Sequence, residues 1–121
     1  MSLDVYLMGE EREEECHYCG CVLKNPEELY TANITHNLVR MADAAGIYDA
    51  LWRPDEHELT TAHQLVPLLT AGLVALEADE ERFSEMNPDN GWGDYHGLVR
   101  FTRNYLHACK ENPDAKVVVS R

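Results

Sequence analysis

Cys16-His17-Tyr18-Cys19-Gly20-Cys21 is the stretch around which the fold is predicted, and Asn33-Ile34-Thr35-His36-Asn37 follows it after a hairpin-length interval. A Cys-x-x-Cys pair followed by glycine is typical of a zinc knuckle. The tight turn brings two thiolates onto one ion, and Gly20 tolerates the positive φ that such a turn requires. We therefore expect a structural Zn²⁺ bound by Cys16 and Cys19.

The remaining ligands of this ion are less clearly marked. His36 is the preferred third ligand, because it follows the hairpin at a helix start, where the helix dipole keeps an imidazole neutral. A histidine that bonds a backbone carbonyl there explains the position equally well. Cys21 lies two residues past Cys19, points the same way in a strand and competes for the third position. The fourth position stays open among Cys21, a carboxylate and water, and Cys109 is interpreted as a buried structural thiol.

The sequence on either side of the cysteines predicts short strands. Residues 2–8 alternate apolar and polar side chains, which is a strand pattern. Residues 9–15 are mostly glutamate and are interpreted as a solvated acidic turn. Residues 21–24 and 28–34 are predicted as two strands separated by the turn signal Asn25-Pro26. These two strands would form a small hairpin with the cysteines at its base.

The rest of the chain reads as helices followed by a last strand. Local signals predict helices at residues 36–45, after the N-cap Thr35, and at residues 47–53 and 78–86. The capping box Thr61–Gln64 opens another helix, for which Pro67 predicts a kink or a late start. The last helix is predicted at residues 95–111, after the N-cap Asp94, and a strand follows at residues 116–120. We therefore predict an α+β fold in one domain, residues 1–121. Three or four helices would pack on a small sheet that joins both termini to the knuckle hairpin.

Composition limits the classes of partner. The chain has 121 residues, 45% hydrophobic content and a net charge of −12, which repels nucleic-acid phosphates and anionic membranes and suits a basic protein partner. No apolar window spans a bilayer, and the N-terminus lacks a basic-then-apolar signal, so we expect a cytoplasmic protein. Reduced thiols in that compartment favour metal binding over disulfides.

Several polar and aromatic residues stand at helix starts or tight turns and suggest a ligand site. They are Asn33, His36, Asn37, Arg53 and Trp92. If His36, Arg53 and Trp92 converge on one pocket, a small metal-dependent or nucleotide-acting enzyme, or a small-ligand receptor, becomes the better hypothesis. Otherwise helix caps explain these polar residues.

Two aromatic positions and one histidine group have competing interpretations. Trp92 lies between two glycines and is either an exposed anchor or a side chain folded onto the core; the second interpretation is preferred, as it is for Trp52. Asp55, His57 and His63 would form a second metal site only if a loop brought them together. A solvated polar connection is the preferred interpretation.

Several short motifs resemble a group of small proteins from tailed-phage and bacterial genomes. The likeness lies in residues 31–37, 45–48, 51–54, 87–88 and 90–95. The resemblance implies a compact single domain and a phage or prophage origin, and it carries no catalytic residues or activity to this chain. With no convincing nucleophile–base pair, phosphate loop or carboxylate dyad, we expect a non-enzymatic interaction protein, one by which a phage engages a host protein.

Overall fold

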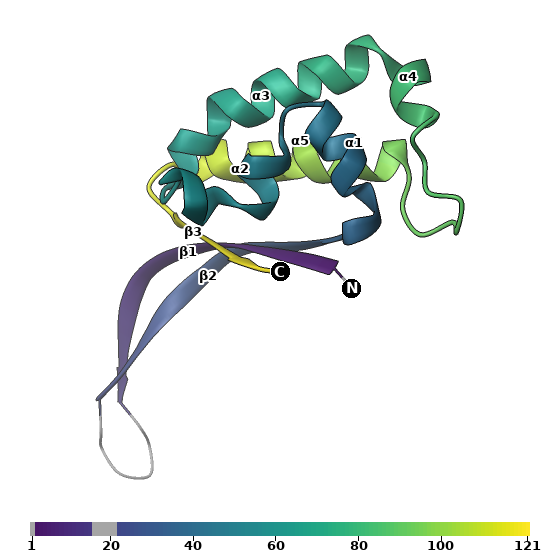
Figure 1. Cartoon of the computed structure of the whole chain (residues 1–121). Coiled ribbons are helices and arrows are strands. Elements are labelled where there is room, and N and C mark those ends of the chain that lie inside the picture. The colour runs from purple at the N-terminus through teal and green to yellow at the C-terminus, as the bar shows by residue number, and fades with distance from the viewer. Residues whose placement is uncertain (1, 16–21) are drawn as a thin grey trace.

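The computed structural model describes residues 2–15 and 22–121. In chain order the elements are β1 (Ser2–Glu15), β2 (Val22–Thr35), η1 (His36–Leu38), α1 (Val39–Ala44), α2 (Tyr48–Trp52), η2 (Pro54–His57), α3 (Ala62–Ala78), α4 (Glu80–Ser84), α5 (Tyr95–Glu111) and β3 (Lys116–Ser120). The α-helices gather above one end of a long β-hairpin (Figure 1). The predicted α+β class is therefore confirmed.

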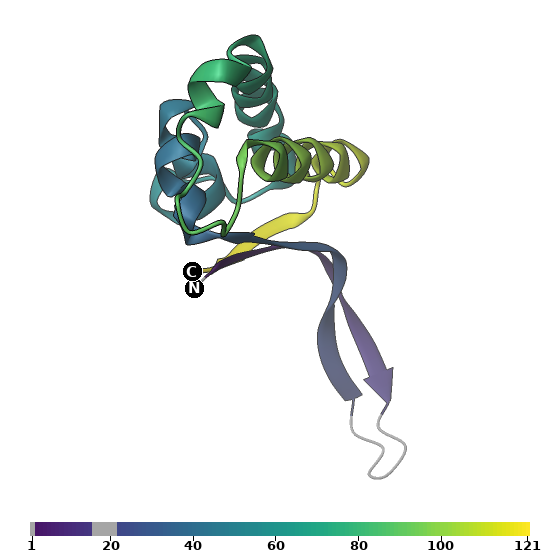
Figure 2. The same cartoon turned by 90° about the vertical axis from the view of Figure 1, so that its right-hand side faces the viewer.

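The three strands form an antiparallel sheet in the order β2-β1-β3. β3 pairs with the first part of β1, from Asp4↔Ser120 to Met8↔Lys116, so the two termini lie together as predicted. The helices cover one face of this sheet, as two perpendicular views show (Figure 2). Five α-helices occur in the described part instead of three or four, because the chain between β2 and α3 forms two short ones.

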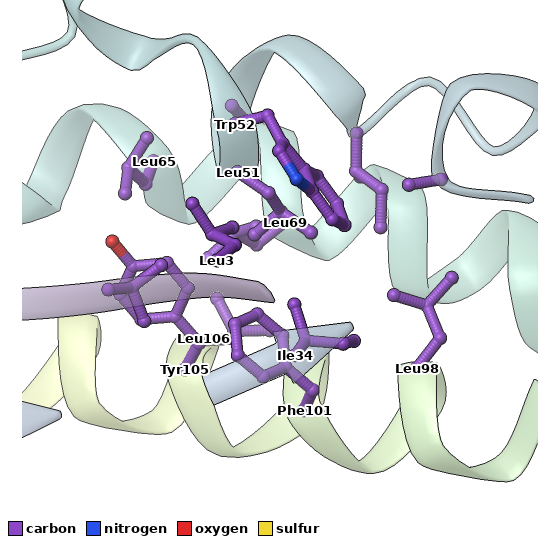
Figure 3. Close-up of a cluster of buried hydrophobic side chains, with 14 of the residues drawn as sticks. Leu3, Ile34, Leu51, Trp52, Leu65, Leu69, Leu98, Phe101, Tyr105 and Leu106 are labelled. Carbon is purple, nitrogen blue, oxygen red and sulfur yellow. The ribbon is translucent and has the colours of Figure 1, made fainter. Parts of the chain in front are cut away.

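The core lies between the sheet and the helices. Leu3, Val5 and Leu7 point to the helical side and are completely buried, as the alternation of residues 2–8 predicts. Leucines and aromatic side chains from α2, α3 and α5 pack against them (Figure 3). This burial supplies the main favourable term in folding.

The helix boundaries follow their capping signals. Thr35 Oγ1 accepts a hydrogen bond from Asn37 N, and Asp94 Oδ1 accepts one from Gly97 N at 2.7 Å. Both halves of the capping box at Thr61 are present. The late start at Pro67 is wrong, because α3 begins at Ala62 and carries the proline in its second turn.

The hairpin differs from the predicted one. Residues 9–15 are part of β1 and not a turn, and β2 is a single strand with Asn25-Pro26 inside it. The pairing continues to Glu15↔Val22, with register shifts between Leu7 and Met8 and between Met8 and Glu11. An edge strand tolerates proline because one row of its N–H groups faces away from the sheet. Cys16, Cys19 and Cys21 lie outside the described residues, so the predicted knuckle is not described.

Candidate functional site

The outer half of the hairpin, which we call the acidic arm, comprises residues 9–15 and 22–28. β3 reaches only as far as Met8 on β1, so beyond that residue the sheet has two strands. Both views show this part projecting away from the helices (Figures 1 and 2). The arm contains seven glutamates against Arg12 and Lys24. A large share of the net negative charge therefore stands on one protrusion.

The register separates His36 from the cysteines. Thr35, the residue before His36, pairs with Ser2, whereas Cys16 and Cys21 adjoin the Glu15↔Val22 pair. β1 has 14 residues, which corresponds to a length of roughly 45 Å at ~3.3 Å per residue. The structure thus places His36 at the body end of the hairpin, whereas Cys16, Cys19 and Cys21 lie outside the described residues, in the connection between Glu15 and Val22.

The imidazole of His36 has a partner of its own. Trp52 Nε1 donates a hydrogen bond to His36 Nδ1 at 2.8 Å, and the two rings lie 6.3 Å apart. Because Nδ1 accepts, the proton of the neutral ring is on Nε2, and neither nitrogen then has a free lone pair for a metal. This hydrogen bond favours a structural role for His36 over the predicted ligand role, and Trp52 is buried as predicted.

Arg53 lies in a separate surface cluster. Its Nε donates to the Tyr48 hydroxyl at 3.3 Å, and its guanidinium pairs with Glu56. The Tyr48 hydrogen bond is the largest cause that raises the pKa of Arg53. Tyr48 in turn stacks on Trp52, with ring centroids 5.8 Å apart. Arg53 therefore contacts the first residue of α2, and it is not among the residues that line the cavity at Trp92.

Trp92 is exposed, contrary to the preferred interpretation. It is 70% accessible, and its backbone N–H donates to Asn90 Oδ1 at 2.9 Å. The loop reaches the body through Gly93, which has φ +93°, and a Cβ on Gly93 would lie 2.6 Å from Thr35 Cγ2. The glycine backbone, and not the indole, thus packs on the body, and Trp92 stands above that contact.

Three of the predicted contact residues do converge. Asn33, Asn37 and Trp92 line one cavity of about 460 Å³ together with Ser2 and Thr35. Asn33 is held in place because its Nδ2 donates to Ser2 Oγ at 2.8 Å and to Asp4 Oδ1 at 2.7 Å. His36 and Arg53 are not among the residues that line it. The convergence expected of an enzyme site at His36, Arg53 and Trp92 is thus absent from the part of the chain described.

A second cavity, of about 320 Å³, lies between β2 and α5, and Asn33 and Thr35 line both cavities. We call the pair of cavities the edge cleft. One wall is the end of β2, from Tyr30 to Thr35, and the other is formed by Leu38, Gly93, Gly97, Arg100, Phe101 and Asn104. The last four are spaced i, i+3, i+4 and i+7 on α5 and form one helical stripe. That spacing is visible in the sequence, and Phe101 belongs both to this stripe and to the buried core.

Asp55, His57 and His63, the weaker candidate metal ligands, each contact a different residue. Asp55 forms an ion pair with Arg121, whose hydrogen bond lowers the pKa of this carboxyl. His57 contacts Asp49, and His63 Nδ1 lies 3.1 Å from the Pro113 carbonyl oxygen. Within residues 2–15 and 22–121, no three His, Cys, Asp or Glu side chains gather as a metal site.

The part of the chain described contains no helix with the length and apolar character needed to cross a bilayer. Comparisons with protein-family models, with curated proteins and with solved structures found no match.

Proposed function

We propose that this chain is a protein-interaction module that engages a basic surface of a partner protein with its acidic arm. The observation that carries the proposal is the projection of a glutamate-rich, two-stranded hairpin from a packed body. We also propose, from the motif resemblance, that the protein is of phage or prophage origin and that the partner belongs to the bacterial host.

Physical chemistry supports a partner for the arm. A two-stranded hairpin is only marginally stable in water without a third strand or a packed face. The excess of glutamates over Arg12 and Lys24 adds self-repulsion along the arm, although the register sets Glu13 opposite Lys24. A basic partner would neutralise this charge, cover the ribbon and accelerate encounter by electrostatic steering.

A structural zinc ion remains part of the proposal, with its ligands restricted to the hairpin end. Cys16, Cys19 and Cys21 all lie in the connection between β1 and β2, outside the described residues. Three thiolates and a water or carboxylate would complete a tetrahedral site. Such a site would fix the end of the arm.

The proposal is tested by removing negative charges from the arm in one variant and from the body in another. The arm variant carries glutamine at Glu10, Glu11, Glu13, Glu14 and Glu15. The matched body variant carries glutamine at Glu56, Glu58, Glu80, Glu81 and Glu85, which are all exposed. Proteins captured from bacterial lysate by the wild type are purified, and their affinities for all three forms are measured by calorimetry at low and high salt.

We expect the arm variant to lose at least about tenfold in affinity, and the salt dependence to weaken with it, because fewer charges are screened. The body variant should bind as the wild type does. Equal loss in both variants, or no partner that saturates, would refute the proposed role of the arm.

A further inference from the structure

The two halves of β2 differ in how their free edge is protected. β2 pairs only with β1 in the described sheet, so one row of its backbone groups is left without strand partners. The arm half carries Pro26, Glu27 and Glu28, and proline and charge are the usual means by which proteins keep edges from pairing. The half that meets the body, residues 30–35, has neither: it is uncharged and rich in strand-forming residues.

The unprotected half of β2 is the half that forms a wall of the edge cleft. The lining includes Ala32 and Gly97, whose small size leaves room for a main chain beside the strand, whereas the Gly93 backbone packs on Thr35 at the end of this segment. Leu38 and Phe101 give the cleft apolar surface. A strand edge beside a helical stripe is the arrangement in which proteins accept an added peptide strand.

The charge on the wall of the edge cleft indicates which kind of peptide would bind there. Arg100 is exposed and has no hydrogen bond or ion pair with the residues described, although the chain has a net charge of −12. Asn104 follows one turn later on the same stripe. A guanidinium left unpaired there is suited to a carboxylate, which it binds by two parallel hydrogen bonds.

Trp92 stands at the other end of the edge cleft, where the cavity that it lines adjoins the cavity along β2 through Asn33 and Thr35. Its indole is exposed while the Gly93 backbone packs on Thr35. Exposed tryptophans that are held by a fixed backbone are typical anchors of protein interfaces.

We propose that an extended segment of a partner protein adds as a strand to the edge of β2 at residues 30–35, with a carboxylate side chain on Arg100 and an apolar side chain on Trp92. Main-chain hydrogen bonds to the β2 edge hold the segment, and the two side chains select it. A second copy of the chain is the poorer occupant, because its own residues 30–35 would bring no acidic group to Arg100. This site does not depend on the acidic arm.

The probe is a displayed library of short random linear peptides, selected on the full-length protein. We expect the selected peptides to share one Asp or Glu at a fixed distance from an apolar or aromatic residue. Each peptide is then resynthesised with single N-methyl groups along its backbone. N-methylation should reduce affinity by about tenfold or more at every second residue and have little effect between, because an antiparallel strand turns alternate amides to its neighbour.

Two variants and a matched control test the side-chain contacts. Arg100→Glu should lose the acidic peptides and select basic ones, and Trp92→Ala should weaken the wild-type peptides about tenfold. Lys110→Glu makes the same charge change at an exposed position of α5 outside the edge cleft and should select the wild-type peptides. Thermal melting monitored by circular dichroism checks that each variant is folded.

Several outcomes would overturn this assignment: no enriched peptide, the same peptides on Arg100→Glu, N-methyl effects without alternation, or self-association through β2 in ultracentrifugation. The arm variant with five glutamines should keep the selected peptides. The arm proposal is tested by the captured partner, and the edge proposal is tested by the selected peptides. Because the arm variant should lose the partner and keep the peptides, failure of one proposal can be told from failure of the other.

Discussion

Two tyrosines of α5 show that the effect of a hydroxyl group on stability depends on whether it has a hydrogen-bond partner. Tyr95 donates from its hydroxyl to the Leu76 carbonyl oxygen at 2.7 Å. Leu76 lies in the last turn of α3, where carbonyl groups have no partner within the helix. The hydroxyl of Tyr105 is buried and has no hydrogen-bond partner among the described residues, although its ring stacks on Tyr30.

Removing the two hydroxyls should therefore have opposite effects on the free energy of unfolding. Tyr105→Phe should raise it by about 1 kcal/mol, because a buried hydroxyl without a partner is costly. Tyr95→Phe should lower it by about 1–3 kcal/mol, because the Leu76 carbonyl loses its donor. Urea unfolding of both variants measures the difference, and each serves as the control for the other. A loss of stability in Tyr105→Phe would contradict the assignment of an unpaired hydroxyl.

At the level of elements, the hairpin is divided by the end of β3. Up to Met8, β1 lies between two strands and buries its apolar side chains under the helices. Beyond Met8 the sheet has only two described strands, and these project away from the helices in both views (Figures 1 and 2). A zinc ion bound at the hairpin end would thus act on the arm and would not hold the core together.

We predict that purified protein contains zinc, and that a chelator removes it while the melting temperature of the body stays within about 2 °C. The physical reason is that the described core lies between the helices and the first part of the sheet, from which the hairpin projects away (Figure 1). Zinc content is measured by elemental analysis and melting by near-ultraviolet circular dichroism.

Cys16→Ser with Cys19→Ser should abolish zinc, whereas His36→Ala should keep it, because His36 Nδ1 is occupied by Trp52. A protein without stoichiometric zinc, or loss of zinc in His36→Ala, would show that the hairpin site is wrong.

Across the whole molecule, burial controls the response to alkali. Desolvation raises the pKa of Cys109 from 9.0 to about 12. The pKa of Tyr105 is also raised, first by burial and then by the nearby Cys109. Both groups hold their protons more tightly in the folded state, so their contribution to stability is complete below the unfolded-state pKa and is lost as pH rises.

We therefore predict that the free energy of unfolding falls between about pH 9 and pH 12, by at most ~1.4 kcal/mol per pH unit for each group. Urea titrations over that range measure the slope. Tyr105→Phe should give a shallower slope than the wild type, because one of the two groups is gone. A flat profile would show that neither group is buried in solution.

Local signals in the sequence determined most of the elements. The alternation in residues 2–8, the caps at Thr35, Thr61 and Asp94, the last strand and the burial of Cys109 all agree with the structure. Each depends on residues within a few positions of one another, where backbone hydrogen bonding and hydrophobic period act directly.

Tertiary structure alone decided the length of the hairpin, the partner of His36 and the edge cleft. Residues 9–15 show no alternation of apolar and polar side chains, so they resemble a turn until β2 pairs with them. His36 and Trp52 are 16 residues apart, and Trp92 reaches the end of β2 only because Gly93 packs on Thr35. Contacts between distant segments depend on how packed elements are placed, and a single sequence does not record that placement.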